Sequence, residues 1–157
     1  MKRLEKIHRF FVKVANLLQS PFLLAIRLYW GWQFFETGKG KLENIQNVVQ
    51  FFQTLNIPVP EVNAWIVAIM ECLGGLLLLA GLGSRLVAFA LAFDMVIAYI
   101  TADSDALKSI FTDSDKFVQA APFPFLLMTL TVLSFGAGVF SLDWLIGKIF
   151  SGRTTKA

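Results

Sequence analysis

Four long stretches of apolar residues follow one another along the chain, and short segments rich in polar residues, glycine or proline separate them. Each stretch is close to the length of a helix that crosses a bilayer, which needs about 20 mainly apolar residues. The predicted spans cover residues 20–37, 61–82, 85–101 and 117–142. This pattern predicts an all-α fold, an integral membrane four-helix bundle.

Segments outside the spans place apolar residues at helical spacing with polar residues between them. Residues 1–19 mix apolar and basic side chains, a pattern typical of an amphipathic interfacial helix on an anionic membrane surface. Residues 42–57 carry an apolar stripe between glycines and prolines, which predicts a second surface helix or a lid. Gly38 and Gly40 are expected to close the first span. If residues 42–57 are a lid over a pocket open to the outer side, Gly38→Ala and Pro58→Ala should alter ligand binding more than folding. The expected organisation is an interfacial helix at 1–19, a four-span domain at 20–142, and a tail with a short interfacial helix at 143–157.

The composition supports a membrane location, since 56% of the residues are hydrophobic and 16 are phenylalanine. Lysine and arginine are unevenly distributed. Nine lie in the N-terminal segment, the 82–85 turn and the tail, and four lie in the two loops that follow the first and the third predicted spans, on the other side of the membrane. Positive side chains favour the cytoplasmic side, so both termini are predicted to be cytoplasmic. Cysteine labelling from either side of the membrane tests this topology, and a cytoplasmic 102–116 loop would contradict it.

Few residues are available for metal or redox chemistry. Cys72 is the single cysteine, which excludes a disulfide framework or a thiolate metal cluster, and the lone histidine, His8, lies in the charged N-terminal segment. No covalent or metal cofactor is therefore expected. The net charge of +3 gives no reason to expect nucleic acid as a partner. The expected partners are the lipid bilayer and either another protein or a second copy of this chain.

Three charged residues interrupt the apolar stretches: Arg27, Glu71 and Asp94. A single charge at the centre of a membrane helix costs roughly 2.5 to 3.5 kcal/mol, so pairing of Arg27 with one or both acids is expected. Glycines lie three or four residues from two of these charges, at Gly31 and Gly75. Small residues let helices pack closely, which indicates that the charges face the interior of the bundle.

Two interpretations of these charges remain open. They can form a buried ion pair that sets the register of the helices, or they can line a polar pocket for an amphipathic headgroup or a proton relay. One arginine against two acids leaves a negative excess, so either one carboxyl is protonated or a second cation approaches. The candidate ligand-binding residues are Arg27, Gly31, Phe34, Glu71, Gly75 and Asp94.

The sequence also carries three motifs of a known family. RLYWGWQFFETGKGKL matches the pattern R-L-x-x-G-x-x-F followed by G-x-x-K-L, from Arg27 to Leu42. ECLGGLLLLAGLGSR matches E-x-x-G-G-x-L-L-L-x-G-L-x-x-R, and GAGVFSLD matches G-x-G-x-x-S-L-D and ends at Asp143. Together these motifs resemble those of the DoxX family of small four-span membrane proteins, over about residues 20 to 145. Asn56 stands where such proteins commonly have glycine before an isoleucine-proline pair.

The resemblance implies a four-span bundle in a bacterial or archaeal cytoplasmic membrane. Similar proteins are described as subunits linked to quinol oxidation, sulfur-compound oxidation or oxidative-stress complexes, and distant relatives act as membrane assembly factors. One hypothesis is therefore an accessory subunit of a membrane redox complex that binds quinone, quinol or lipid in a pocket around Arg27 and Glu71. The other is a non-catalytic assembly or stabilising partner whose buried charges are structural. Native mass spectrometry, which reports bound ligands and partner subunits together, separates the two.

Overall fold

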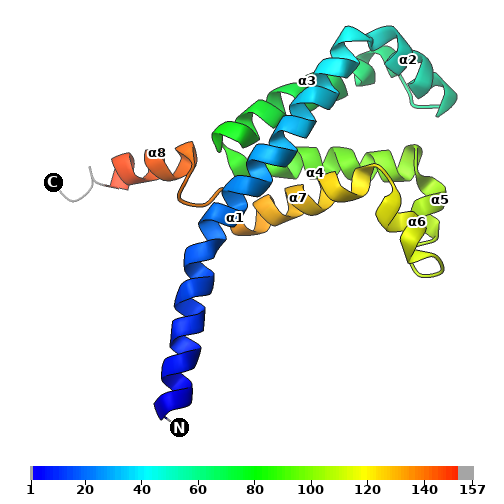
Figure 1. The fold of residues 1–157 in the computed structure, drawn as a ribbon. Helices are drawn as coiled ribbons and strands as arrows, with labels where there is room; N and C mark the ends of the chain where they lie inside the picture. Colours follow the sequence, from blue (N-terminus) through cyan, green and yellow to red (C-terminus); the bar gives the residue numbers. More distant parts are fainter. Residues whose placement is uncertain (1, 152–157) are drawn as a thin grey trace.

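The computed structural model describes residues 2–151, and the side chains of residues 5–150. In this part of the chain every regular element is a helix, which confirms the predicted all-α fold. The helices that are long and apolar enough to cross a bilayer are α1 (Lys2–Glu43), α3 (Pro60–Ala80) and α4 (Ser84–Thr101). With the shorter apolar helix α7 (Pro122–Phe135) they form a bundle in which α1 packs mainly on α3, and α4 on α7 (Figure 1).

Helix α1 is longer than the sequence pattern suggested. It runs without interruption for 42 residues with Pro21 inside it, so the boundary expected between residues 19 and 20 and the end expected at Gly38 and Gly40 are both wrong. Proline removes only one backbone hydrogen bond and bends a helix rather than ending it when both flanks favour helix. Figure 1 shows the N-terminal half of α1 turning away from the bundle. That residues 1–19 lie on a membrane surface stays a prediction, and Met1 is outside the described residues.

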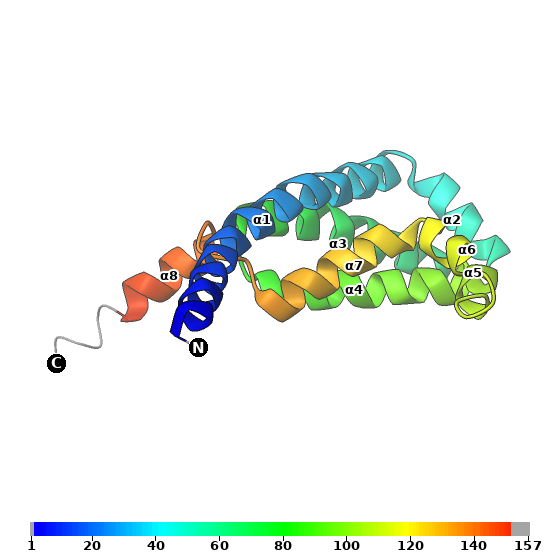
Figure 2. The same ribbon diagram turned by 60° about the horizontal axis from the view of Figure 1, so that its bottom comes forward.

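The short helices gather at the two ends of the bundle (Figures 1 and 2). One end carries α2 (Ile45–Thr54), which confirms a helix in the predicted surface segment, together with α5 (Ser104–Lys108) and α6 (Ser114–Gln119) of the acidic loop. The other end carries the N-terminal half of α1 and α8 (Leu142–Ser151). The tail was predicted to contain a short helix, and α8 is that helix, while residues 152–157 lie outside the described range.

The connection between α2 and α3 depends on unusual backbone angles. Asn56 has a φ of +54° and Val59 a φ of +45°. Asparagine tolerates this left-handed region better than most residues, which accounts for its standing where similar proteins commonly have glycine. Val59 is β-branched, and its conformation is therefore strained. Pro60 then begins α3. A backbone N–H at this position would have no acceptor within the helix, so proline, which lacks an N–H, loses no hydrogen bond there.

The fourth span is shorter than predicted. Helix α7 has 14 residues, about 21 Å of helix at 1.5 Å per residue, rather than the 26 residues of the apolar stretch. Gly136, with a φ of +78°, ends it. Residues 136–141 are not helical, which leaves backbone carbonyls available to another partner.

Glycines bring α1 and α3 into backbone contact. A Cβ at Gly75 would lie 2.5 Å from the backbone N of Phe35, and a Cβ at Gly31 would lie 3.1 Å from the backbone oxygen of Gly75. Only residues without a side chain allow this approach, as the small-residue faces predicted. The core that these contacts border includes the fully buried Phe34, Leu78, Leu91 and Val132.

Candidate functional site

The Arg27 side chain is buried at the end of the bundle that carries α8, and it does not pair with Glu71. Its Nη1 donates to the carbonyl of Ala137 at 2.9 Å, and its Nη2 donates to the carbonyl of Phe140 at 2.8 Å. Among the described residues no carboxylate lies within 4.0 Å of the guanidinium. The Arg27–Glu71 pair expected from the sequence is therefore wrong, because the unwound segment after α7 supplies acceptors that hydropathy cannot reveal.

Asp143 completes this end of the structure. Its Oδ1 accepts from the backbone N–H of Gly83 at 2.7 Å, and its Oδ2 accepts from that of Ser84 at 2.8 Å, where α4 begins. Burial would raise the pKa of the Asp143 carboxyl, but these hydrogen bonds and the charge of Arg27 outweigh it and hold the pKa below its ordinary value. The Arg27–Asp143 cluster thus connects α1, α4 and α8.

The lowered pKa of Asp143 predicts a pH dependence of stability. The ionised carboxyl stabilises the fold fully above its ordinary pKa of about 3.9, and this contribution is lost as the pH falls through the lowered value. Asp143→Asn is expected to lower the free energy of unfolding by about 1 kcal/mol at neutral pH. Thermal unfolding in detergent between about pH 3 and about pH 7 should show the difference from wild type shrinking in acid. The same substitution at the exposed Asp115 is the control, and equal effects at both positions would contradict the assignment.

A second charge group lies at the end of the bundle that carries α2. Lys41, in the last turn of α1, places its Nζ 2.5 Å from Oε1 of Glu71 on α3. The Glu71 side chain is 3% exposed and that of Lys41 is 32% exposed. The carboxylate is therefore buried while the ammonium keeps access to solvent. Such a charge-assisted hydrogen bond is among the stronger ones in proteins.

Asp94 adds a second carboxyl to this group from the facing helix α4. Its side chain is buried and lines the same cavity as Lys41 and Glu71. Oε2 of Glu71 and Oδ2 of Asp94 are both buried, and neither has a hydrogen-bond partner among the described residues. Most buried polar atoms in proteins have partners, so these two acceptors call for an explanation.

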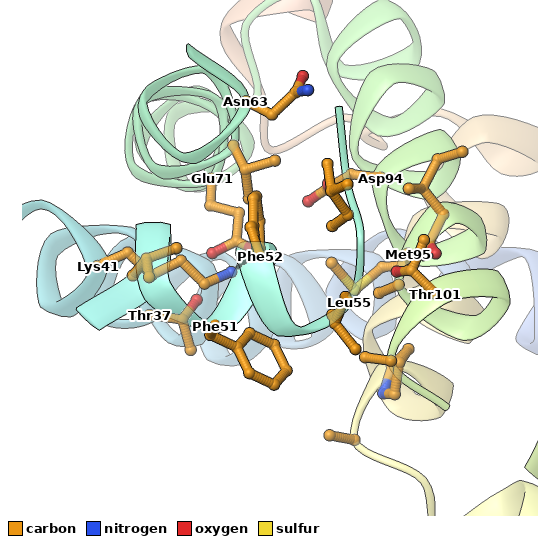
Figure 3. Close-up of a pocket in the computed structure, with 18 of the residues that line it drawn as sticks. Thr37, Lys41, Phe51, Phe52, Leu55, Asn63, Glu71, Asp94, Met95 and Thr101 are labelled. Atoms are coloured by element: carbon orange, nitrogen blue, oxygen red, sulfur yellow. Dashed lines mark hydrogen bonds and ion pairs between the residues drawn. The ribbon is translucent and has the colours of Figure 1, made fainter. Parts of the chain in front are cut away.

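A cavity of about 1010 Å³ lies against these two carboxyls. Figure 3 shows Lys41 reaching Glu71 on one side, Asp94 pointing into the same space, and Phe52 and Leu55 lying over the gap between them. Its walls come from the C-terminal part of α1, from α2, from α3 and α4, and from the start of α7, and most of the lining is apolar. Helix α2 thus forms part of the wall of the cavity, and a lid function of residues 42–57 stays a prediction.

The six residues singled out from the sequence lie in different places. Phe34, Glu71 and Asp94 line the cavity. Arg27 belongs to the structural cluster at the opposite end. Gly31 and Gly75 form the contact between α1 and α3.

The hydropathy pattern does not reveal Lys41 as a member of the charge group. It was counted as a loop residue because the first span was expected to end at Gly38. Phe34, Gly38 and Lys41 follow one another at spacings of four and three, which puts them on one face of a continuous helix. That periodicity is the signal that could have found it.

Comparisons with known proteins agree with the motifs. A family model described as DoxX matches residues 22–104, which include Arg27, Lys41, Glu71 and Asp94. The protein named "Putative oxidoreductase CatD" of Bacillus subtilis (strain 168) is 28% identical over 109 residues, which cover 69% of this chain and 73% of that protein. No solved structure matches this chain.

Proposed function

Since the chain belongs to the DoxX family of membrane proteins, we propose that it is an accessory subunit of a membrane redox complex and binds a quinone or quinol beneath α2. The name of the similar Bacillus subtilis protein, an oxidoreductase, supports a redox connection. The electron carrier is supplied by a partner protein, and this chain supplies the binding site for the quinone or quinol ring within the membrane.

The observation that carries this proposal is the combination of an apolar cavity with a buried charge group in its wall. Ligand cavities commonly have volumes of about 300 to 1,000 Å³ and a few polar groups that orient the ligand. At about 1010 Å³ the cavity has room for a substituted ring and the first part of an apolar tail. Lys41, Glu71 and Asp94 line it, and their ammonium and carboxyl groups are of the kind that orients such a ligand.

Native mass spectrometry of the protein purified from membranes tests the proposal. We expect quinone or quinol to be retained by the wild type and lost from Ala98→Phe, which fills the cavity from α4. Ala90→Phe is the matched control, since Ala90 lies on the same helix, is partly exposed and is not among the residues that line the cavity. Equal retention in both variants would mean that the ligand lies elsewhere.

The same experiment tests the alternative of a non-catalytic assembly partner. The Arg27–Asp143 cluster supports that alternative in part, because its charged groups bind backbone groups of the chain itself. A partner protein that is retained by wild type and Ala98→Phe alike, with no quinone or quinol in either, would support the assembly role.

A further inference from the structure

The cavity lies where α3 and α4 diverge. The two helices are close near the turn that joins them, where a Cβ at Gly74 would lie 3.0 Å from Cδ1 of Leu91. They separate toward the end of the bundle that carries α2 (Figure 1). Beyond the contact at Gly74, residues within 63–71 of α3 and 93–101 of α4 line the cavity.

The side of the cavity between α1 and α7 is closed by aromatic rings. The ring of Phe125 on α7 meets those of Trp30 and Phe34 on α1 edge to face, with centroids 5.2 Å and 4.7 Å apart. No aromatic pair among the described residues joins α3 to α4. The gap between α3 and α4 therefore lacks the closure that the opposite side has.

The rim of this gap is apolar and lies deep in the membrane. Phe93 and Ile97 of α4 line the cavity and are also 61% and 39% exposed, and the half-buried Val67 lines it from α3. Phe93 is near the middle of α4, whose 18 residues extend about 27 Å. Because the hydrocarbon core of a bilayer is about 30 Å thick, a gap at this depth faces lipid tails rather than water.

The end of the cavity beneath α2 has a polar rim instead. Asn44, Asn47 and Asn56 line the cavity there and are exposed. An apolar chain that left the cavity past these side chains would be hydrated and would lose the free energy of its burial. The same chain remains among apolar groups if it leaves between α3 and α4.

We propose that the gap between α3 and α4 is a side opening to the bilayer that holds the apolar tail of the ligand. The proposal rests on the proposed function and adds where the tail lies and how the ligand enters. At about 1010 Å³ the cavity has room for a ring and only the first part of a long tail. The rest of the tail passes between Val67 and Ile97 into the lipid, so the ligand enters from the bilayer without crossing water.

Photo-cross-linking of the full chain in phosphatidylglycerol nanodiscs tests the proposal. An isoprenoid tail and a phospholipid acyl chain are both apolar, so each has its own probe: a decyl ubiquinone with a diazirine in its tail, and a phosphatidylglycerol with a diazirine in one acyl chain. We expect the quinone probe to form adducts with Val67 and Ile97 that excess unlabelled quinone removes. Mass spectrometry of the digested protein locates the adducts. Competed adducts at Asn44, Asn47 or Asn56 instead would overturn the proposal.

Substitutions at the rim test whether the tail uses this route. Ile97→Trp narrows the opening and is expected to weaken binding of the quinone probe about tenfold. Val96→Trp is its matched control, since Val96 is the preceding residue, is 40% exposed and is not among the residues that line the cavity. Val67→Trp narrows the opening from α3, with the exposed Ile66→Trp as its control, so a failure of one variant to fold leaves the other. Equal binding in the rim variants and their controls would contradict the proposal.

The two probes separate this proposal from the proposed function. Adducts of the phosphatidylglycerol probe at Val67 that Ala98→Phe abolishes, without any competed quinone adduct, would retain the side opening and overturn the quinone site. Competed quinone adducts that lie only away from the gap would retain the quinone site and overturn the side opening. No adduct at Val67 or Ile97 from either probe would also overturn the side opening.

Discussion

Replacing Gly38 with alanine is expected to lower the free energy of unfolding by about 3 kcal/mol, because the new methyl group would collide with the backbone of α3. A Cβ at this position would lie 2.7 Å from Cα of Cys72 and 2.8 Å from the carbonyl carbon of Glu71. Backbone atoms of a helix cannot rotate away, so α1 and α3 would have to separate. Thermal unfolding in detergent measures the loss.

Gly40→Ala is the matched control for this prediction. Gly40 lies two residues further along the same helix, and no described atom outside its own turn would come within 4 Å of its Cβ. Glycine inside a helix is less stable than alanine by roughly 0.5 to 1 kcal/mol, so this variant should be as stable as the wild type or slightly more so. Similar melting temperatures for the two variants would show that α1 and α3 are further apart than the structure has them.

From the sequence, Gly38→Ala was expected to alter ligand binding more than folding, whereas the structure predicts a large loss of stability. A glycine near the end of an apolar stretch fits two roles equally well, as a helix stop or as a point of close helix contact. Hydropathy along one chain does not distinguish them, because the second role depends on the partner helix. Gly136, in contrast, does end its helix, and its positive φ is the reason.

Much of the fold was predictable because membrane-spanning helices can be recognised from their length and their apolar composition. Helices α3 and α4 lie within two residues of their predicted bounds. Helix α7 was overestimated because its apolar stretch continues past Gly136 into a segment whose carbonyls are satisfied by Arg27 rather than by a helix. A hydrophobic run shows that a segment lies in the membrane, and it does not show that the segment is helical throughout.

The charge groups were harder to predict than the helices. Glu71 and Asp94 were expected to belong to a buried charge group with Arg27 because unpaired charges in a membrane helix are costly. Their partner was misassigned, since the sequence offered Arg27 within a span and placed Lys41 in a loop. Whether a cation reaches an acid depends on where α1 ends and how it crosses α3, and both are set by tertiary packing at Gly31, Gly38 and Gly75.

Lys41 and Glu71 should therefore show strong energetic coupling. Lys41→Met leaves a buried carboxylate next to Asp94, which we expect to lower the free energy of unfolding by about 3 to 5 kcal/mol. Glu71→Leu leaves a lysine whose side chain can extend to solvent, so its loss should be smaller. The double variant should recover about 1 to 3 kcal/mol relative to the sum of the single losses, because replacing a whole buried pair is often nearly neutral.

The matched cycle with Arg27 should show no coupling. Arg27→Leu leaves the carbonyls of Ala137 and Phe140 without donors, and these acceptors have no contact with Glu71. The losses from Arg27→Leu and Glu71→Leu should add within about 0.5 kcal/mol. Denaturant or thermal unfolding of the three single and two double variants beside the wild type measures both cycles. Coupling in the Arg27 cycle that equals or exceeds coupling in the Lys41 cycle would show that Arg27, and not Lys41, compensates the buried glutamate.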